Sequence, residues 1–273
     1  MLTPIQRDQY QTFGCVILRN YLSVAEVGRL QAESRRELAW QFRHKPFDGT
    51  RRHFTCMNQD HRTPFAAGLL QDERFLGVAD QLLGRALPMW CDANRYTDPL
   101  TGWHPDCVDQ EWSWQLPAAK FCIYLQPLRA DSGALRVIPG SHHRPLHDQV
   151  RVFLGEHQVR VAEVPALVCD TDPGDVILFQ TALWHASDGG GRDRGLNTLA
   201  YYTAPTTPLQ RAGLQRALAD QVPQIRSDLG WLGEVFPQHW LDAAAADARR
   251  RLVVERIQEA GVIAAVSSGA SVC

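Results

Sequence analysis

Short apolar segments that alternate with clusters of glycine, proline and aspartate dominate the middle of this 273-residue chain, between about residues 87 and 203. Apolar runs of this length, closed by turn residues, are typical of β-strands. The regular spacing of such strands favours an antiparallel sandwich or barrel. The pattern predicts strands at residues 120–125, 134–138, 159–164, 175–179 and 196–203.

The segment before this core carries helical signals. Thr3 and Ser23 are typical N-cap residues, each followed by a helical first turn. The expected elements are a short helix ended by Gly14, a strand at 15–18, a helix that begins after Ser23, a long loop at 41–66 and a helix at 72–83.

The segment after the core is expected to be helical as well. The pattern changes at Pro208, and an Ala- and Arg-rich helix is predicted near 238–260. Residues 263–273 consist mostly of small residues and are expected to be a disordered tail. We therefore expect one domain over residues 1–262, with its β-core at 87–203.

The composition is that of an ordinary folded protein. Apolar residues make up 45% and charged residues 21%, so the chain can bury enough surface to offset its ordering entropy. No apolar run approaches the roughly 20 residues of a membrane span, and residues 1–20 lack a secretory signal pattern. The net charge of −2 gives no reason to expect nucleic acid or an anionic membrane as a partner. The seven cysteines form no CxxC pair, which fits reduced thiols in a cytoplasmic protein.

A candidate metal site begins at Trp103-His104-Pro105-Asp106, where a histidine has a carboxylate two positions on. Residues i and i+2 of an extended segment project from the same face, so His104 and Asp106 can reach one ion. A second histidine from a distant strand would complete a two-His, one-carboxylate triad, which leaves three adjacent positions open on a ferrous ion. The spacing alone fits equally well a turn in which the aspartate caps local amides.

The second histidine has several candidates. His185 follows an apolar strand introduced by Pro173-Gly174-Asp175. A lone histidine after such a strand is more often a buried structural residue than a ligand. The competing histidines, of which the first two follow a Pro-Gly turn, are His142, His143, His147 and His157.

Four stretches of the chain, taken together, match the pattern of a known family. They are the opening segments 2–18 and 24–30, the His-x-Asp step at 103–106, the signature Ser132-Gly-Ala-Leu-Arg-Val-Ile-Pro-Gly-Ser-His142, and the segment from Gly174 to Ser187. In these stretches, and in their order and spacing, the chain resembles the phytanoyl-CoA dioxygenase family of iron(II)- and 2-oxoglutarate-dependent oxygenases.

The resemblance implies a fold, a metal site and a reaction. The fold would be mainly β with flanking helices, a double-stranded β-helix or cupin-like jelly roll. His104, Asp106 and His185 would bind Fe(II). The family consumes dioxygen and 2-oxoglutarate, releases succinate and carbon dioxide, and oxidises a small-molecule substrate, usually by hydroxylation. Relatives that halogenate lack the carboxylate ligand, so Asp106 favours hydroxylation or another oxidation.

The resemblance also implies how 2-oxoglutarate is held. The family has an arginine on the strand after the distal histidine, which pairs with the far carboxylate of the cosubstrate. Arg194 is the best match, because it keeps the family's distance to the aromatic at Tyr201. Arg192 is the alternative, since the loop after His185 is shorter than usual. Ser187 matches a serine that the family uses near the cosubstrate.

Side-chain alternation predicts part of the pocket lining. Lys120, Cys122 and Tyr124 share one face of a strand. If this face lines the cavity, Lys120 can meet an acidic group of the substrate or cosubstrate; otherwise its ammonium group lies in solvent. Arg95 and Trp103 are further candidates for the pocket.

Two other functions fit the same residues. One is a cupin-like metalloenzyme that does not use 2-oxoglutarate. The other is a non-catalytic binding module, against which the intact set of three metal ligands argues. The sequence carries no signal for the oligomeric state.

Overall fold

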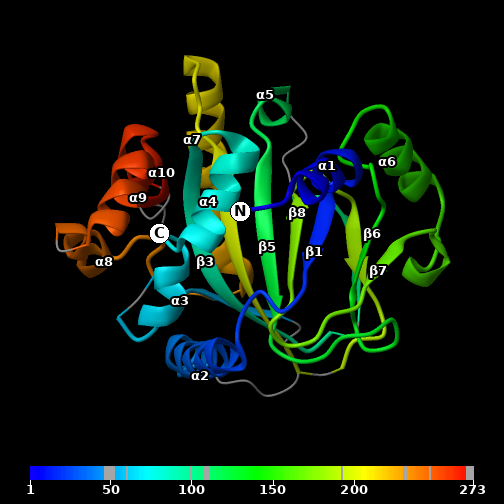
Figure 1. The fold of residues 1–273 in the computed structure, drawn as a ribbon, viewed down its shortest axis with the longest axis horizontal. Coiled ribbons are helices and arrows are strands. Elements are labelled where there is room, and N and C mark those ends of the chain that lie inside the picture. Colours follow the sequence, from blue (N-terminus) through cyan, green and yellow to red (C-terminus); the bar gives the residue numbers. More distant parts are fainter. Residues whose placement is uncertain are drawn as a thin grey trace.

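Two antiparallel β-sheets, with helices around them, make up the computed structural model (Figure 1). No helix among the described residues is long and apolar enough to cross a bilayer. The structure describes residues 1–45, 53–59, 61–98, 100–106, 111–191, 193–229, 231, 233–245 and 247–268.

The two sheets have the strand orders β1-β8-β5-β10-β3-β2 and β4-β9-β6-β7, and every strand pair in them is antiparallel. This arrangement is the double-stranded β-helix that the family resemblance implies. The larger sheet contains β1 (Cys15–Leu18), β8 (Val176–Gln180), β5 (Ala118–Tyr124), β10 (Arg194–Thr203), β3 (Ala86–Tyr96) and β2 (His53–Met57). The smaller sheet contains β4 (Thr101–His104), β9 (His185–Ser187), β6 (Leu135–Val137) and β7 (Leu167–Cys169).

The helices precede, interrupt and follow the strands, and Figure 1 shows the C-terminal ones beside β3. Those before β3 are α1 (Pro4–Phe13), α2 (Val24–Gln41), α3 (Pro64–Leu69) and α4 (Glu73–Leu83). Those between strands are α5 (Glu111–Trp114), α6 (Leu146–Glu156) and the 3-10 turn Val161–Glu163. Those after β10 are α7 (Pro208–Leu229), α8 (Gln238–Asp242), the 3-10 turn Ala243–Ala245, α9 (Ala248–Glu259) and α10 (Val262–Ser268).

The predicted helix starts and ends are confirmed where capping residues mark them. Thr3 and Ser23 both form capping boxes with the third residue of their helices. Gly14 ends α1 with φ 80°, a left-handed conformation that glycine adopts without steric cost.

Three of the predicted elements are wrong. The expected loop at 41–66 contains β2 and the start of α3, and its residues 46–52 and 60 lie outside the described residues. The expected strand at 159–164 contains a 3-10 turn instead, and β7 lies further along the chain. The tail expected from 263 is helical as far as Ser268, because α10 packs against α7 and α9; residues 269–273 lie outside the described residues.

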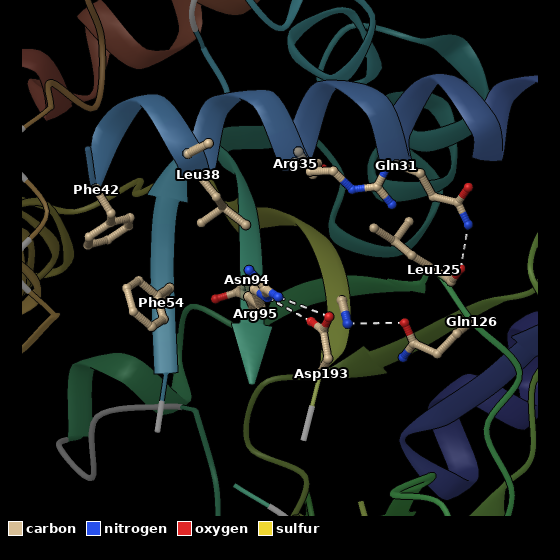
Figure 2. Close-up of a pocket in the computed structure, with 13 residues that line it drawn as sticks. Gln31, Arg35, Leu38, Phe42, Phe54, Asn94, Arg95, Leu125, Gln126 and Asp193 are labelled. Carbon is tan, nitrogen blue, oxygen red and sulfur yellow. Dashed lines mark hydrogen bonds and ion pairs between the residues drawn. The ribbon is translucent and has the colours of Figure 1, made fainter. Parts of the chain in front are cut away.

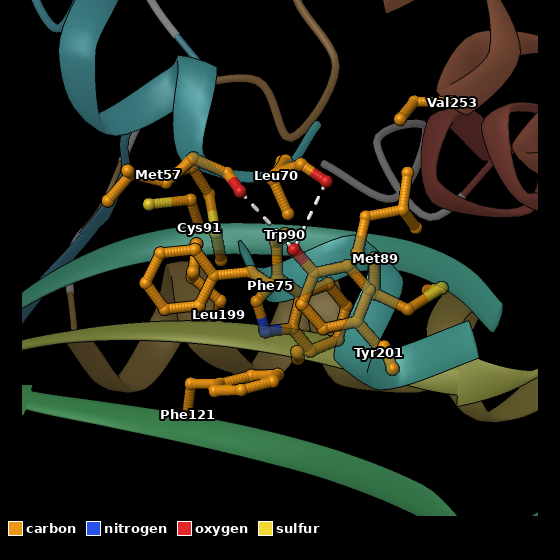
Figure 3. Close-up of a cluster of buried hydrophobic side chains, with 14 of the residues drawn as sticks. Met57, Leu70, Phe75, Met89, Trp90, Cys91, Phe121, Leu199, Tyr201 and Val253 are labelled. Atoms are coloured by element: carbon orange, nitrogen blue, oxygen red, sulfur yellow. Dashed lines mark hydrogen bonds between the residues drawn. The ribbon is translucent and has the colours of Figure 1, made fainter. Parts of the chain in front are cut away.

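A cluster of aromatic side chains fixes the orientation of β5 and β10 (Figure 3). The ring of Phe121 packs edge-on against Phe75 at 5.2 Å and against Tyr201 at 5.7 Å. The Tyr201 hydroxyl donates a hydrogen bond to the carbonyl of Leu70 (3.1 Å). Because side chains alternate along a strand, this outward packing turns the neighbours of Phe121 on β5 toward the other face of the sheet.

Candidate metal centre

A cavity of about 310 Å³ contains the predicted metal ligands. Both sheets contribute to it, the smaller one through β4, β6 and β9, and the larger one through β2, β3, β5, β8 and β10. Its lining consists of His53, Thr55, Asp92, Asn94, Tyr96, Thr101, His104, Asp106, Lys120, Cys122, Tyr124, Leu135, Phe179, His185, Ala186, Ser187, Arg194 and Leu196.

Strand pairing brings the two candidate histidines together. β4 and β9 are neighbours in the smaller sheet, and their register places His104 opposite His185. The ring centroids are 4.3 Å apart. Nδ1 of His104 lies 2.8 Å from the carbonyl of Gly102, and Nδ1 of His185 lies 2.9 Å from that of Leu183. Since a protonated Nδ1 donates to each carbonyl, both Nε2 atoms keep a lone pair for a metal ion.

Asp106 completes the cluster. Its backbone N–H donates to the carbonyl of Thr181 (2.7 Å), which holds the chain directly after β4. Oδ1 of Asp106 is 3.8 Å from Nε2 of His104 and 3.7 Å from Nε2 of His185. One ligand atom from each of the three residues lies within 4.8 Å of the other two. Two imidazoles and one carboxylate at this spacing fit a divalent transition metal.

The charge states of the ligands suit a cation. Burial lowers the pKa of His185 to about 4, so its imidazole is neutral near neutral pH. Burial alone would raise the pKa of Asp106, but Lys120 and the two histidines outweigh it and lower this pKa overall. The site therefore offers the neutral imidazole of His185 and an ionised carboxylate.

Lys120 is the direct partner of the carboxylate ligand. Its Nζ donates to Oδ2 of Asp106 (2.9 Å), whereas Oδ1 is the oxygen that faces the histidines. The ion pair therefore directs one carboxylate oxygen toward the metal position and keeps the other away from it. A carboxylate held in this way binds through a single oxygen, which leaves more of the coordination sphere open.

The signature segment after Ser132 supports the distal histidine. The hydroxyl of Ser141 accepts a hydrogen bond from the backbone N–H of Trp184 (2.9 Å), and the N–H of Ile138 donates to the carbonyl of Trp184 (3.0 Å). These bonds, together with the pairing of β6 with β9, fix the backbone directly before His185.

Replacement of Ser141 by alanine is expected to lower the free energy of unfolding by about 1–3 kcal/mol, because the buried N–H of Trp184 loses its acceptor. Urea unfolding followed by fluorescence measures this change. Ser132→Ala is the control, since that serine bonds the partly exposed turn at Arg129 and its loss costs less. Equal unfolding midpoints for Ser141→Ala and wild type would contradict this role.

Two polar groups of the cavity lack the partners that burial normally demands. Nε of Arg194 and Oγ of Ser187 are both buried, and neither has a hydrogen-bond partner among the described residues. Nη1 of Arg194 donates to the carbonyl of Gly133 (2.8 Å), and its guanidinium lies over the ring of Tyr96, 4.9 Å from the centroid. A cation and a hydroxyl with unused hydrogen-bonding capacity in one cavity fit a carboxylate ligand.

Glycine is required at position 133 for this arrangement. Gly133 has φ 89°, and a Cβ atom there would overlap Nη1 of Arg194 and the backbone of Gly190. The conformation and the close approach both exclude a larger residue. This glycine therefore allows the guanidinium to lie against the backbone inside the cavity.

The family model for phytanoyl-CoA dioxygenase (PhyH) matches residues 10–194, more than half of the chain and including all three candidate ligands. The chain belongs to the phytanoyl-CoA dioxygenase family. This assignment confirms what the resemblance implied, namely an iron(II)- and 2-oxoglutarate-dependent oxygenase. No match was found among the curated proteins compared.

Several solved structures share this family fold. HygX from Streptomyces hygroscopicus, with nickel and 2-oxoglutarate bound, is 21% identical with a TM-score of 0.60, over 74% of this chain and 87% of HygX. EctD from S. alaskensis, with bound Fe, is 23% identical with a TM-score of 0.57, over 74% of this chain and 77% of EctD. SnoN, an α-ketoglutarate-dependent epimerase from nogalamycin biosynthesis, is 17% identical with a TM-score of 0.56, over 76% of this chain and 87% of SnoN.

Of the other residues predicted to line the pocket, some lie in the cavity and some do not. Lys120 and Tyr124 line the cavity, as expected if their face of β5 points inward. Trp103 is not in the lining, because it precedes His104 on β4 and side chains alternate along a strand. Arg192 lies outside the described residues.

The prediction for Arg95 is wrong. Arg95 is on the opposite face of β3 and forms a two-pronged ion pair with Asp193 (2.7 and 2.9 Å). It lines a second cavity, of about 630 Å³, between α2 and the larger sheet (Figure 2). Successive side chains of β3 point to opposite faces of the sheet, so Arg95 points away from the cavity that its neighbour Asn94 lines.

Sequence reasoning missed the polar wall of the cavity on β2 and β3. It consists of His53, Thr55, Asp92 and Asn94. The signal was present in Asp92 and Asn94, two polar residues at alternate positions of a strand whose first six residues are apolar. Such a pattern indicates a strand with one polar face, and here that face looks into the cavity.

Proposed function

We propose that this chain binds iron(II) through His104, Asp106 and His185, holds 2-oxoglutarate with Arg194 and Ser187, and hydroxylates a small organic substrate. The observation that carries the proposal is the pair of buried, unsatisfied polar groups at Arg194 and Ser187 in the same cavity as the metal ligands. When bound, iron with 2-oxoglutarate and dioxygen supplies the oxidising chemistry, with succinate and carbon dioxide as the co-products.

The protein contributes position and charge. His104, Asp106 and His185 would hold the metal ion, and Arg194 and Ser187 line the same cavity, where the other reactants would bind. Lys120 acts as a positioning residue, because it holds Oδ2 of Asp106 while Oδ1 faces the histidines. Arg194 can bind a carboxylate through its guanidinium, of which only Nη1 has an acceptor among the described residues.

Asp106 favours hydroxylation or another oxidation over halogenation. A carboxylate at this position occupies the place that a halide would need, which disfavours halogenation. The similarity to SnoN, which is described as an epimerase, makes stereochemical inversion the second candidate. A cupin-like reaction without 2-oxoglutarate is disfavoured by the unsatisfied Arg194 and Ser187.

Succinate is expected to form only when iron(II), 2-oxoglutarate and dioxygen are all present. The protein is reconstituted with iron(II) without oxygen, oxygen is admitted, and succinate is measured by mass spectrometry, first without and then with candidate substrates. Product with one oxygen atom from labelled dioxygen supports hydroxylation, whereas an isomer of unchanged mass supports epimerisation. Asp106→Ala is the inactive control, and succinate formation without added iron by a metal-free sample would contradict the proposal.

A further inference from the structure

One carboxylate of the cavity takes no part in the metal site or in the proposed cosubstrate contacts. Asp92 lies on β3 and lines the cavity, although only 8% of it is exposed. It forms no ion pair with any residue that the structure describes, and the lysine of the lining, Lys120, pairs with Asp106. A buried carboxylate without a cationic partner is costly, so its presence here needs an explanation.

The side chains that donate hydrogen bonds to Asp92 all bind the same carboxylate oxygen. Nδ2 of Asn94 (2.6 Å) and the hydroxyl of Thr198 (2.7 Å) both donate to Oδ1. Neither side chain bonds Oδ2, and Oδ2 is not among the fully buried atoms that lack a partner, so it keeps access to the cavity. An ionised carboxylate oxygen has two lone pairs and can only accept.

The neighbouring strands hold this acceptor in a fixed orientation. In the register of the larger sheet, Asn94 lies opposite Thr55 and Asp92 lies opposite Thr198. The Thr55 hydroxyl donates to Oδ1 of Asn94, which also lies 2.9 Å from Nε2 of His53. These contacts turn Nδ2 of Asn94 toward Asp92. Burial raises the pKa of Asp92 and the charge of Lys120 opposes that shift, so a further donor at Oδ2 would relieve the same penalty.

The size and polarity of the cavity restrict what can approach Oδ2. Its volume of about 310 Å³ lies at the lower end of the range for ligand pockets, roughly 300–1,000 Å³. Part of this space belongs to 2-oxoglutarate under the proposed function. The wall around Asp92 carries the polar side chains of His53, Thr55 and Asn94. A long acyl chain matches neither this space nor this wall.

We propose that Asp92 anchors the substrate, and that the substrate is a small polar molecule whose donor group, an ammonium or a hydroxyl, bonds Oδ2. The inference rests on the proposed function, because it assigns a substrate class to the same cavity. Asp92 thereby becomes a specificity residue that lies across the cavity from β4 and β9, which carry the histidine ligands.

Matched probes test the donor requirement without knowledge of the natural substrate. Cyclohexylamine, cyclohexanol and methylcyclohexane place an ammonium, a hydroxyl and a methyl group on one carbon frame, and butylamine, butan-1-ol and pentane repeat the comparison on a linear frame. Binding to the protein loaded with iron(II) and 2-oxoglutarate, without oxygen, is followed by the change in visible absorption and in melting temperature. We expect the donor-bearing members to bind at least about 10-fold more tightly than the hydrocarbons.

Asp92→Asn replaces the hydrogen-bond acceptor Oδ2 with a hydrogen-bond donor. The asparagine keeps an oxygen for Asn94 and Thr198 but presents an NH2 group in place of Oδ2. The advantage of the donor-bearing probes is expected to fall about 10- to 100-fold in this variant. Thr198→Val is the control, because it removes one hydrogen bond to Oδ1 and leaves Oδ2 in place, so most of the advantage is expected to remain.

Each outcome decides the inference. A preference for the amine assigns an ammonium, and a preference for the alcohol assigns a hydroxyl; either one supports the inference if Asp92→Asn removes it. No preference over the hydrocarbons, a preference that survives in Asp92→Asn, or an equal loss in Thr198→Val would overturn it. Binding of iron(II) and 2-oxoglutarate is measured first in the same samples, so that a failure of the proposed function is recognised separately.

Discussion

His185→Ala is expected to abolish stable iron(II) binding, with a loss of affinity of more than about 100-fold. Changes to groups that only support a metal ligand cost about 10- to 100-fold in affinity, and removal of a ligand itself costs more. His185 is one of only two imidazoles in the cluster, and its Nε2 is held toward Asp106 by the contact of Nδ1 with the Leu183 carbonyl. Iron content after anaerobic reconstitution and desalting measures the loss.

His157→Ala is the matched control for this variant. His157 is exposed at the end of α6 and has no place in the cluster, so iron binding is expected to match wild type. Circular dichroism establishes that both variants are folded. Iron binding by His185→Ala at the wild-type level would remove the metal centre assigned here, and with it the proposed function.

The three metal ligands differ in how far local sequence determines them. His104 and Asp106 are two positions apart, so their proximity follows from any extended backbone. His185 reaches them only through the pairing of β4 with β9, and strand register is not encoded in a short segment. The family pattern indicated that His185 belongs with His104 and Asp106. The signature after Ser132 is part of this pattern because it contains β6, which pairs with β9 and so with the strand of His185.

The errors of sequence reasoning have the same origin. Alternation groups Lys120 with Cys122 and Tyr124 but leaves open which face of the strand lines the cavity, until a buried neighbour such as Phe121 fixes it. Arg95 was assigned without such a reference and lies on the other face. β2 was missed because the alternation of His53 and Thr55 with Phe54 and Cys56 extends over only five residues. Asp92 was missed because its role depends on neighbours from two other strands.

Arg194→Gln is expected to weaken 2-oxoglutarate binding by about 10- to 100-fold while iron(II) binding is retained. A charge-assisted hydrogen bond to a carboxylate contributes more than a neutral one, and glutamine cannot replace the planar cation. Arg194 is 3% exposed and only its Nη1 has an acceptor among the described residues, so a bound carboxylate would find unused guanidinium donors in the cavity. Titration of the iron-loaded protein with 2-oxoglutarate, without oxygen, measures the affinity.

Two further variants test whether Arg194, and not Arg192, binds 2-oxoglutarate, and whether the loss reflects the position of the guanidinium. Arg192→Gln is the matched control, and its 2-oxoglutarate affinity is expected to equal that of wild type. Gly133→Ala leaves the arginine in the chain but places a methyl group where its guanidinium lies, so it is expected to weaken 2-oxoglutarate binding as well. If Arg192→Gln loses the cosubstrate and Arg194→Gln does not, the two arginines exchange roles. If neither variant loses it, the cavity does not hold 2-oxoglutarate through this strand, and the unsatisfied Nε of Arg194 must serve another anion.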